Sequence, residues 1–289
     1  MDKCIDSIKS TGRHKLALIG FPLDTHSSYM KGAALAPPLI RKAFHCESSN
    51  KWSETGIDLG EEDTFIDVGD LEFHSPDNAF DEIEKAVQQL LDRNLFPISL
   101  GGDHSITYPI IKAFNKKYRK IHILHLDAHP DLYDELQGDR HSHACPFARI
   151  MENGLAERLV QVGIRGMNGH QCQQAEKFGV EVMEMKDWRD DIPFRFNAPL
   201  YISFDMDALD PAFAPGVSHF EPGGLTTRQA IRVIQTVKAH EIIGADIVEF
   251  NPRRDPSGVT AMVSAKLLKE IATRIVKPKV PRTSKVRGT

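Results

Sequence analysis

An alternation of short apolar runs with segments of helical periodicity constrains the fold of this chain most strongly. The runs are rich in Ile, Leu and Val and bounded by Gly, Asp or Pro, as buried strands are; they occupy residues 15–20, 64–68, 95–100, 121–126, 158–163, 199–204 and 243–248. Apolar residues at i, i+3 and i+4 predict amphipathic helices over 79–93, 105–117, 144–153, 171–178, 226–240 and 258–276. This alternation predicts an α/β fold, a parallel β-sheet flanked by helices on both faces.

The chain contains no repeat, low-complexity block or interdomain linker, so we expect a single domain over residues 1–276. The basic segment 277–289, which contains two prolines, is expected to be a flexible tail. Residues 47–62 are polar and predict a surface loop. Thr226 or Thr227 is expected to cap the helix that follows, and Ser257 to cap the last helix.

The composition excludes several classes of protein. Thirty-six basic against 40 acidic residues give a net charge of −4, which offers no reason to expect nucleic acid or an anionic membrane as partner. The four cysteines are far apart and form no CxxC pair, which argues against a disulfide framework and a thiolate zinc site. No apolar run approaches about 18 residues, so a membrane span is not expected. A cytoplasmic location is predicted.

Three polar clusters follow predicted strands, where ligands bind in open α/β sheets. They are rich in carboxylates and imidazoles, and the candidate ligands are His104, Asp127, His129, Asp131, Asp205 and Asp207. A lone DxH or DxD is commonly a loop or cap feature, but three such clusters at strand ends are hard to obtain by accident. Carboxylates this close would repel one another unless cations neutralised them. Six ligands without sulfur suggest two metal ions and favour Mn²⁺.

The motifs GGDHS (101–105), DAHPD (127–131) and SFDMDALDP (203–211) resemble the signature blocks of the ureohydrolase family, which includes arginase and agmatinase. The resemblance covers about residues 15–275. Within the family, the chain is most similar to the plant-type arginases, over residues 22–41, 133–154, 160–168, 210–226 and 244–252. The resemblance implies an arginase-like three-layer α/β/α fold and an oligomer, either a trimer or a hexamer.

The resemblance also implies two Mn²⁺ ions per subunit. One would be held by His104, Asp127, Asp131 and Asp205. The other would be held by His129 and Asp207, with Asp127 and Asp205 bridging the two ions.

The same resemblance implies roles for residues near the metals. Asp131 would accept a proton and pass it to the departing amine, and His143 would bind near the substrate and exchange protons with solvent. Glu249 would pair with the substrate guanidinium. Taken alone, His143 could be an exposed histidine at a helix N-terminus and Glu249 a solvated charge. His219 and His26 are further candidates for the rim of the pocket.

The implied reaction is hydrolysis of a guanidino group with release of urea. L-Arginine is the first choice of substrate, and agmatine or another guanidino compound is the alternative. The segment after DAHPD carries Tyr133, Asp134 and Glu135, and Asn168 replaces an acid of the animal-type arginases, so the contacts of those enzymes with the amino-acid head do not transfer. A metal-binding but inactive regulatory homologue is an alternative of a different class. A two-metal phosphoesterase would require converging basic groups, which the three motifs lack.

Overall fold

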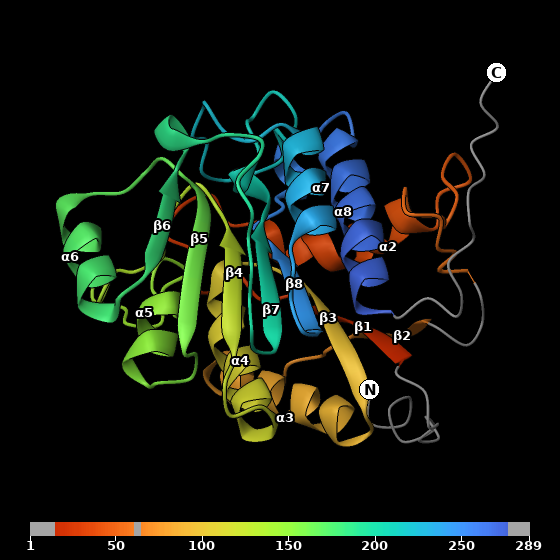
Figure 1. Cartoon of the computed structure of the whole chain (residues 1–289). Coiled ribbons are helices and arrows are strands. Elements are labelled where there is room, and N and C mark those ends of the chain that lie inside the picture. Colours follow the sequence, from red (N-terminus) through yellow and green to blue (C-terminus); the bar gives the residue numbers. More distant parts are fainter. Residues whose placement is uncertain (1–14, 61–64, 277–289) are drawn as a thin grey trace.

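A computed structural model describes residues 15–60 and 65–276, which form one sheet of eight parallel strands in the order β2-β1-β3-β8-β7-β4-β5-β6 (Figure 1). The strands are β1 (Lys15–Phe21), β2 (Phe65–Asp70), β3 (Leu95–Gly101), β4 (His122–Leu126), β5 (Arg158–Ile164), β6 (Glu181–Glu184), β7 (Leu200–Asp205) and β8 (Ile242–Val248). The predicted parallel α/β fold is therefore confirmed.

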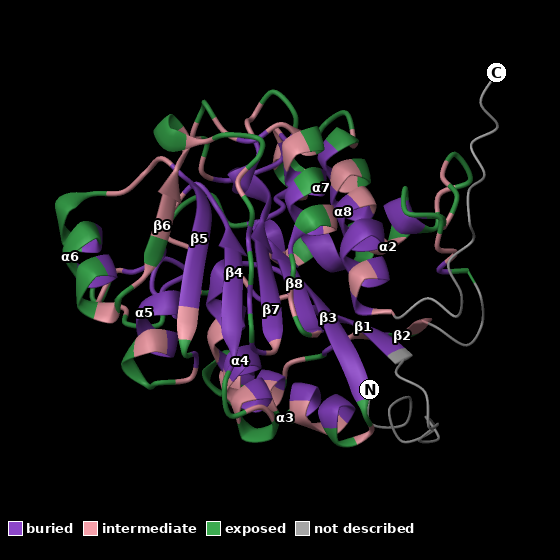
Figure 2. Cartoon of the chain, in the orientation of Figure 1, coloured by how far each residue is buried: buried purple, intermediate pink, exposed green. Residues whose placement is uncertain are grey.

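The helices form two groups, one for each face of the sheet. One group contains α2 (Ala36–Phe44), α7 (Thr227–Thr236) and α8 (Val259–Ile275), in which α8 contacts both other helices. The second contains α3 (Ala79–Asp92), α4 (Thr107–Lys117), α5 (Pro146–Glu152) and α6 (Gly169–Phe178), which contact one another in that order. Strands β3, β4, β7 and β8 are buried along their whole length beneath these layers (Figure 2).

All seven predicted strands and all six predicted helices are present, but two further elements were missed. Helix α2 carries Pro37 and Pro38 in its first turn, where backbone N–H groups have no partner within the helix, so the prolines do not prevent it. Strand β6 is short and partly exposed at the edge of the sheet, and it lacks an apolar run. The helix expected over 226–240 ends at Thr236, because the chain becomes extended at Val237.

The predicted caps have mixed outcomes. Thr226 caps α7, and its hydroxyl accepts the N–H of Gln229 in a capping box. Ser257 is not the N-cap of α8, because the helix begins at Val259 after Gly258, but the Oγ of Ser257 accepts the N–H of Val259 at 3.5 Å. The tail predicted at 277–289 lies outside the described residues.

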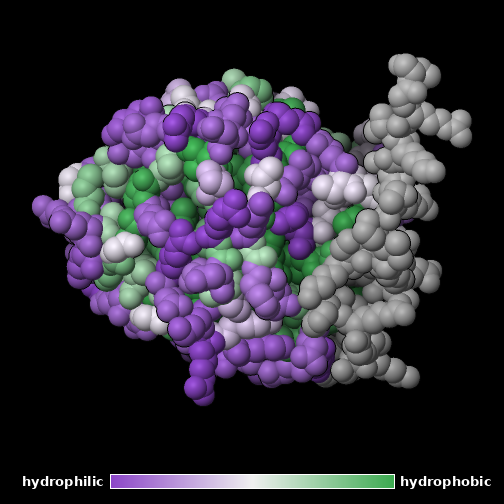
Figure 3. Space-filling view, in the orientation of Figure 1, coloured by the Kyte–Doolittle hydropathy of each residue, from purple (hydrophilic) through white to green (hydrophobic). Residues whose placement is uncertain are grey.

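The face of the molecule seen in Figure 3 is mainly polar. Hydrophilic side chains cover most of the face seen in Figure 3, and hydrophobic ones show mainly in small areas between them. None of the helices in the described ranges is long and apolar enough to cross a membrane. Cys46, Cys145 and Cys172 are free thiols.

Candidate metal centre and substrate cavity

Four neighbouring strands place the predicted site residues at one edge of the sheet. Strands β3, β8, β7 and β4 lie side by side in that order, although they are not consecutive in the chain. Their carboxyl ends carry the candidates: His104 after β3, Glu249 after β8, Asp205 and Asp207 around the end of β7, and Asp127, His129 and Asp131 after β4. The sheet order therefore brings together all of the residues predicted as metal ligands.

The first cluster converges on the Nδ1 atom of His104. This atom lies 3.2 Å from Oδ2 of Asp127, 3.0 Å from Oδ2 of Asp131 and 3.1 Å from Oδ2 of Asp205. All four side chains are buried. Adjacent ligands of an octahedral ion with bonds near 2.1 Å lie about 3 Å apart, so these separations fit a shared cation.

The second cluster shares Asp127 with the first. Nδ1 of His129 lies 3.1 Å from Oδ2 of Asp207 and 3.6 Å from Oδ1 of Asp127. Asp127 thus offers one oxygen to each cluster, as a bridging carboxylate would. Asp205 directs Oδ2 to the first cluster, whereas its Oδ1 accepts the N–H of Asp207 at 2.8 Å. Its predicted bridging role stays a prediction.

The hydrogen bonds behind His104 show that its Nδ1 is suited to bind a cation. Ser203 donates its hydroxyl hydrogen to Oδ1 of Asp246 at 2.6 Å, so its Oγ can only accept from Nε2 of His104, 2.9 Å away. The Nε2 atom therefore carries a proton, so Nδ1, which faces the three carboxylates, is the ring nitrogen that can give a lone pair to a cation. This buried nitrogen makes no hydrogen bond of acceptable geometry within the described chain. The residues present therefore fit a metal ion.

The charges of the site favour the same conclusion. Burial and the neighbouring Asp127 carboxylate raise the pKa of Asp131 to about 7. Burial and the Asp207 and Asp127 carboxylates hold the pKa of Asp205 well above its usual range. Protein groups alone therefore penalise full ionisation of these carboxylates, and cations bound among them would relieve the repulsion.

Two site residues have left-handed backbone conformations, which are uncommon for residues other than glycine, asparagine and aspartate. Asp131 has φ 49° and Glu249 has φ 63°, both in the left-handed region. Each such residue costs on the order of 1–3 kcal/mol unless its surroundings hold it in place. Gly102, between β3 and His104, is required for a different reason: a Cβ there would lie 1.9 Å from the carbonyl oxygen of Leu23. These backbone features set the directions in which the side chains of Asp131, Glu249 and His104 leave the chain.

A cavity of about 200 Å³ opens over the two clusters. It is lined by residues of both clusters and by Ser28, Tyr133, Leu136, His143, Ala144, Gly166, Gln171, His219 and Glu249. No lysine or arginine of the described chain is among its lining residues. Its character is acidic, which suits a cationic ligand and does not suit a phosphate ester.

Glu249 and His143 form a pair at the wall of this cavity. Nδ1 of His143 lies 2.8 Å from Oε1 of Glu249, and its Nε2 lies 2.8 Å from Oγ of Ser28. Burial opposes a charge on His143, but the Glu249 carboxylate outweighs it and raises the pKa of His143 to about 9. Oε1 of Glu249 also accepts the N–H of His104, whereas its Oε2 accepts no hydrogen bond from the described residues.

The rim residues predicted from the sequence have different outcomes. His219 lines the cavity, with its ring centroid 5.1 Å from that of His143. His26 does not line it; its Nδ1 contacts Asp139 and its carbonyl accepts the N–H of His143. Its place is therefore behind the cavity wall. Asp134 pairs with Arg149 and also lies outside the lining.

Sequence reasoning missed four buried polar residues next to the clusters, of which His125 contacts Asp127 and Ser203 contacts His104. His125, Gln161, Ser203 and Asp246 each lie within a strand and are 0% exposed. A signal was available, because a polar residue inside an apolar strand needs a buried hydrogen-bond partner.

A cavity lined by carboxylates and imidazoles at the carboxyl edge of a parallel sheet is the kind of site that metal-dependent hydrolases use. A model of the arginase family matches residues 14–273. "Arginase 1, mitochondrial" of Arabidopsis thaliana is 46% identical over 278 residues, which cover 90% of this chain and 81% of the relative. "Agmatinase, mitochondrial" of Gallus gallus is 36% identical over 272 residues, which cover 88% of this chain and 79% of the relative. The structure of the arginase from Medicago truncatula matches with a TM-score of 0.88 at 41% sequence identity, and the match covers 95% of this chain and 91% of that arginase.

The chain therefore belongs to the arginase family, whose enzymes hydrolyse guanidino C–N bonds at a binuclear metal centre. The predicted ureohydrolase family and enzyme class are confirmed. The predicted cytoplasmic location is contradicted, since similar relatives, including those of Arabidopsis thaliana and Medicago truncatula, are named as mitochondrial enzymes. The cellular location was inferred from composition alone, and composition carries no physical signal for targeting.

Proposed function

We propose that this enzyme hydrolyses L-arginine to L-ornithine and urea with two Mn²⁺ ions. The observation that carries the proposal is the convergence of two imidazole–carboxylate clusters and Glu249 on one acidic cavity. Oxygen and imidazole ligands without sulfur favour manganese over softer metals. His104, Asp127, Asp131 and Asp205 would hold one ion, and His129, Asp207 and the two shared carboxylates would hold the other. When bound, two such ions supply Lewis acidity that brings the pKa of water toward neutrality.

The side chains around the two clusters would bind the substrate and transfer protons. Glu249 faces the cavity with a free Oε2, which can accept a guanidinium N–H and hold the substrate carbon over the clusters. Asp131 lines the cavity, and its carboxylate can accept a proton and return it to the leaving amine. His143 contacts both Glu249 and Ser28 and can exchange that proton with solvent.

One part of the cavity lining supports arginine over agmatine. Tyr133 lines the cavity, and its hydroxyl accepts a hydrogen bond of 2.6 Å from Asn168, the N-cap of α6. The hydroxyl hydrogen of Tyr133 and the positive end of the α6 dipole both favour a carboxylate, which arginine has and agmatine lacks. The relatives named as arginases are also more similar in sequence than those named as agmatinase or guanidino acid hydrolase.

Steady-state kinetics on arginine, agmatine and 4-guanidinobutyrate, measured side by side as urea release by the manganese-loaded enzyme, test the proposal. We expect the highest kcat/KM for arginine. A kcat/KM that favours agmatine would overturn arginine as the substrate. The trimer or hexamer predicted by the resemblance is a separate proposal, which light scattering on the purified protein tests.

A further inference from the structure

A row of buried polar residues crosses the sheet just below the predicted metal ligands. Gln161 of β5 is paired in register with His125 of β4, His125 with Ser203 of β7, and Ser203 with Asp246 of β8. His125 lies two residues before Asp127 on its strand, so both side chains point to the same side of the sheet. Since each member of the row is 0% exposed, each must find its partners within the protein.

The hydrogen bonds of Gln161 determine which nitrogen of His125 carries a proton. The Nε2 atom of Gln161 lies 2.6 Å from the carbonyl oxygen of Pro130 and 3.1 Å from Nδ1 of His125. A carbonyl oxygen only accepts, so the amide nitrogen and not the amide oxygen must occupy this position. The amide N–H then donates to Nδ1 of His125, which must be unprotonated.

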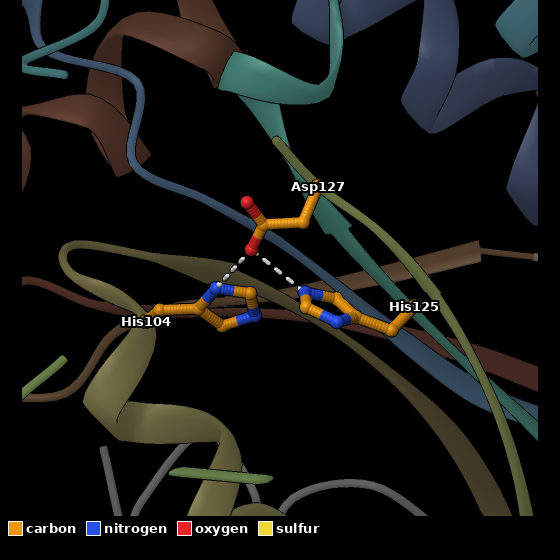
Figure 4. A group of neighbouring side chains, drawn as sticks. All are labelled: His104, His125 and Asp127. Carbon is orange, nitrogen blue, oxygen red and sulfur yellow. Dashed lines mark hydrogen bonds and ion pairs between the residues drawn. The ribbon is translucent and has the colours of Figure 1, made fainter. Parts of the chain in front are cut away.

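The other nitrogen of His125 therefore carries the hydrogen and donates it. Nε2 of His125 lies 2.7 Å from Oδ2 of Asp127, the oxygen that also faces His104 (Figure 4). His125, His104 and Asp127 offer atoms close enough together to hold an ion. A protonated nitrogen has no lone pair to give to a metal, so this position of His125 is not that of a ligand.

We propose that His125 is a positioning residue that holds the shared carboxylate Asp127, and that Gln161 selects the tautomer of His125 needed to do so. This inference rests on the proposed two-metal site. Asp127 must present Oδ2 to one cluster and Oδ1 to the other, and the hydrogen bond from His125 opposes rotation about its Cβ–Cγ bond. The ring of Phe147, whose centroid lies 3.9 Å from that of His125, keeps the imidazole in place.

Counting the bound manganese ions separates a positioning residue from a ligand. The variant H125F removes the hydrogen bond and keeps a ring of similar size, and H125Q restores an N–H of similar reach. The matched control is H122F, because His122 is also a buried histidine of β4 but lies at the opposite end of the strand. Free Mn²⁺ is measured by room-temperature electron paramagnetic resonance during titration of each full-length protein.

We expect the wild type and H122F to bind two ions per subunit with equal affinity. H125F should also bind two ions, with an affinity about 10- to 100-fold lower, and H125Q should recover part of the loss. A stoichiometry of one ion for H125F would identify His125 as a ligand and overturn the inference, as would an unchanged affinity. Fewer than two ions in the wild type would instead refute the two-metal site of the proposed function.

The role of Gln161 is tested through its dependence on His125. Q161M removes the amide donor, and we expect it to weaken manganese binding in the wild-type background but to add little in the H125F background. Q174M is the control, since Gln174 is a buried glutamine of α6 that lies outside the row. Equal losses from Q161M in both backgrounds would show that Gln161 acts through packing alone and would overturn its assignment.

Discussion

The substitution of Asp246 by asparagine should reverse the hydrogen bonds that prepare His104 to bind a metal. Asp246 is fully buried and accepts three hydroxyl hydrogens: Thr107 and Tyr201 donate to its Oδ2, each at 2.9 Å, and Ser203 donates to its Oδ1 at 2.6 Å. Because the side chain only accepts, Ser203 is left to accept from His104.

In D246N the amide oxygen would remain where two hydroxyl groups donate, and the amide nitrogen would face Ser203. Ser203 would then accept from the amide and turn its own hydrogen toward Nε2 of His104. The imidazole proton would move to Nδ1, which faces the three carboxylates. Reversal of a charge-assisted hydrogen bond is worth about 1.5–3 kcal/mol. Since 1.4 kcal/mol is a factor of about ten, manganese binding should weaken about 10- to 100-fold.

The order of affinities among three variants tests this reasoning. S203A removes the hydroxyl between Asp246 and His104 but does not force the imidazole proton onto Nδ1. It should therefore bind manganese more tightly than D246N. The double variant D246N/S203A removes the misplaced donor and should recover to the level of S203A. Manganese titration monitored by electron paramagnetic resonance gives the three affinities, and circular dichroism verifies the fold. Wild-type affinity in D246N, or a double variant weaker than D246N, would refute the tautomer argument.

Three further changes have expected outcomes. E249Q should lower kcat/KM for arginine about 10- to 100-fold while two manganese ions remain bound, because it removes the charge that faces the guanidinium but no ligand; a metal analysis beside the kinetics checks this. In G166A the added Cβ would lie 2.7 Å from Cδ2 of His129 and should weaken the second cluster, measured as a lower affinity for one of the two ions. The hydrogen bond from Arg228 lowers the pKa of Glu54 to about 2 from 4.5. Its ionised form thus stabilises the fold above pH 4.5, and that contribution is lost as the pH falls toward 2. E54Q should cost about 1 kcal/mol at pH 7, discounted for the exposure of the pair, and progressively less below pH 4.5 in urea unfolding.

The sequence was sufficient to predict the strands and the residues at their carboxyl ends because both signals are local. Apolar runs mark the buried strands, and the spacing of Asp127, His129 and Asp131 is visible within five residues of chain. Helix α2 escaped prediction because two prolines normally interrupt a helix, and only its start tolerates them. The location of the enzyme was inferred incorrectly because composition carries no information about targeting.

The pairing within the polar row could not be predicted because it depends on the order of the strands. A glutamine in β5, a histidine in β4, a serine in β7 and an aspartate in β8 each indicate a buried hydrogen-bond partner, but no single strand shows which residue that partner is. Their meaning arises from the order β8-β7-β4-β5 and from the register that aligns them. Once aligned, donors and acceptors leave few arrangements of the protons, and those arrangements direct a lone pair of His104 toward the candidate metal position and a hydrogen of His125 toward Asp127. Two buried histidines whose ring centroids lie 5.0 Å apart thereby acquire opposite roles, because their hydrogen-bond partners differ.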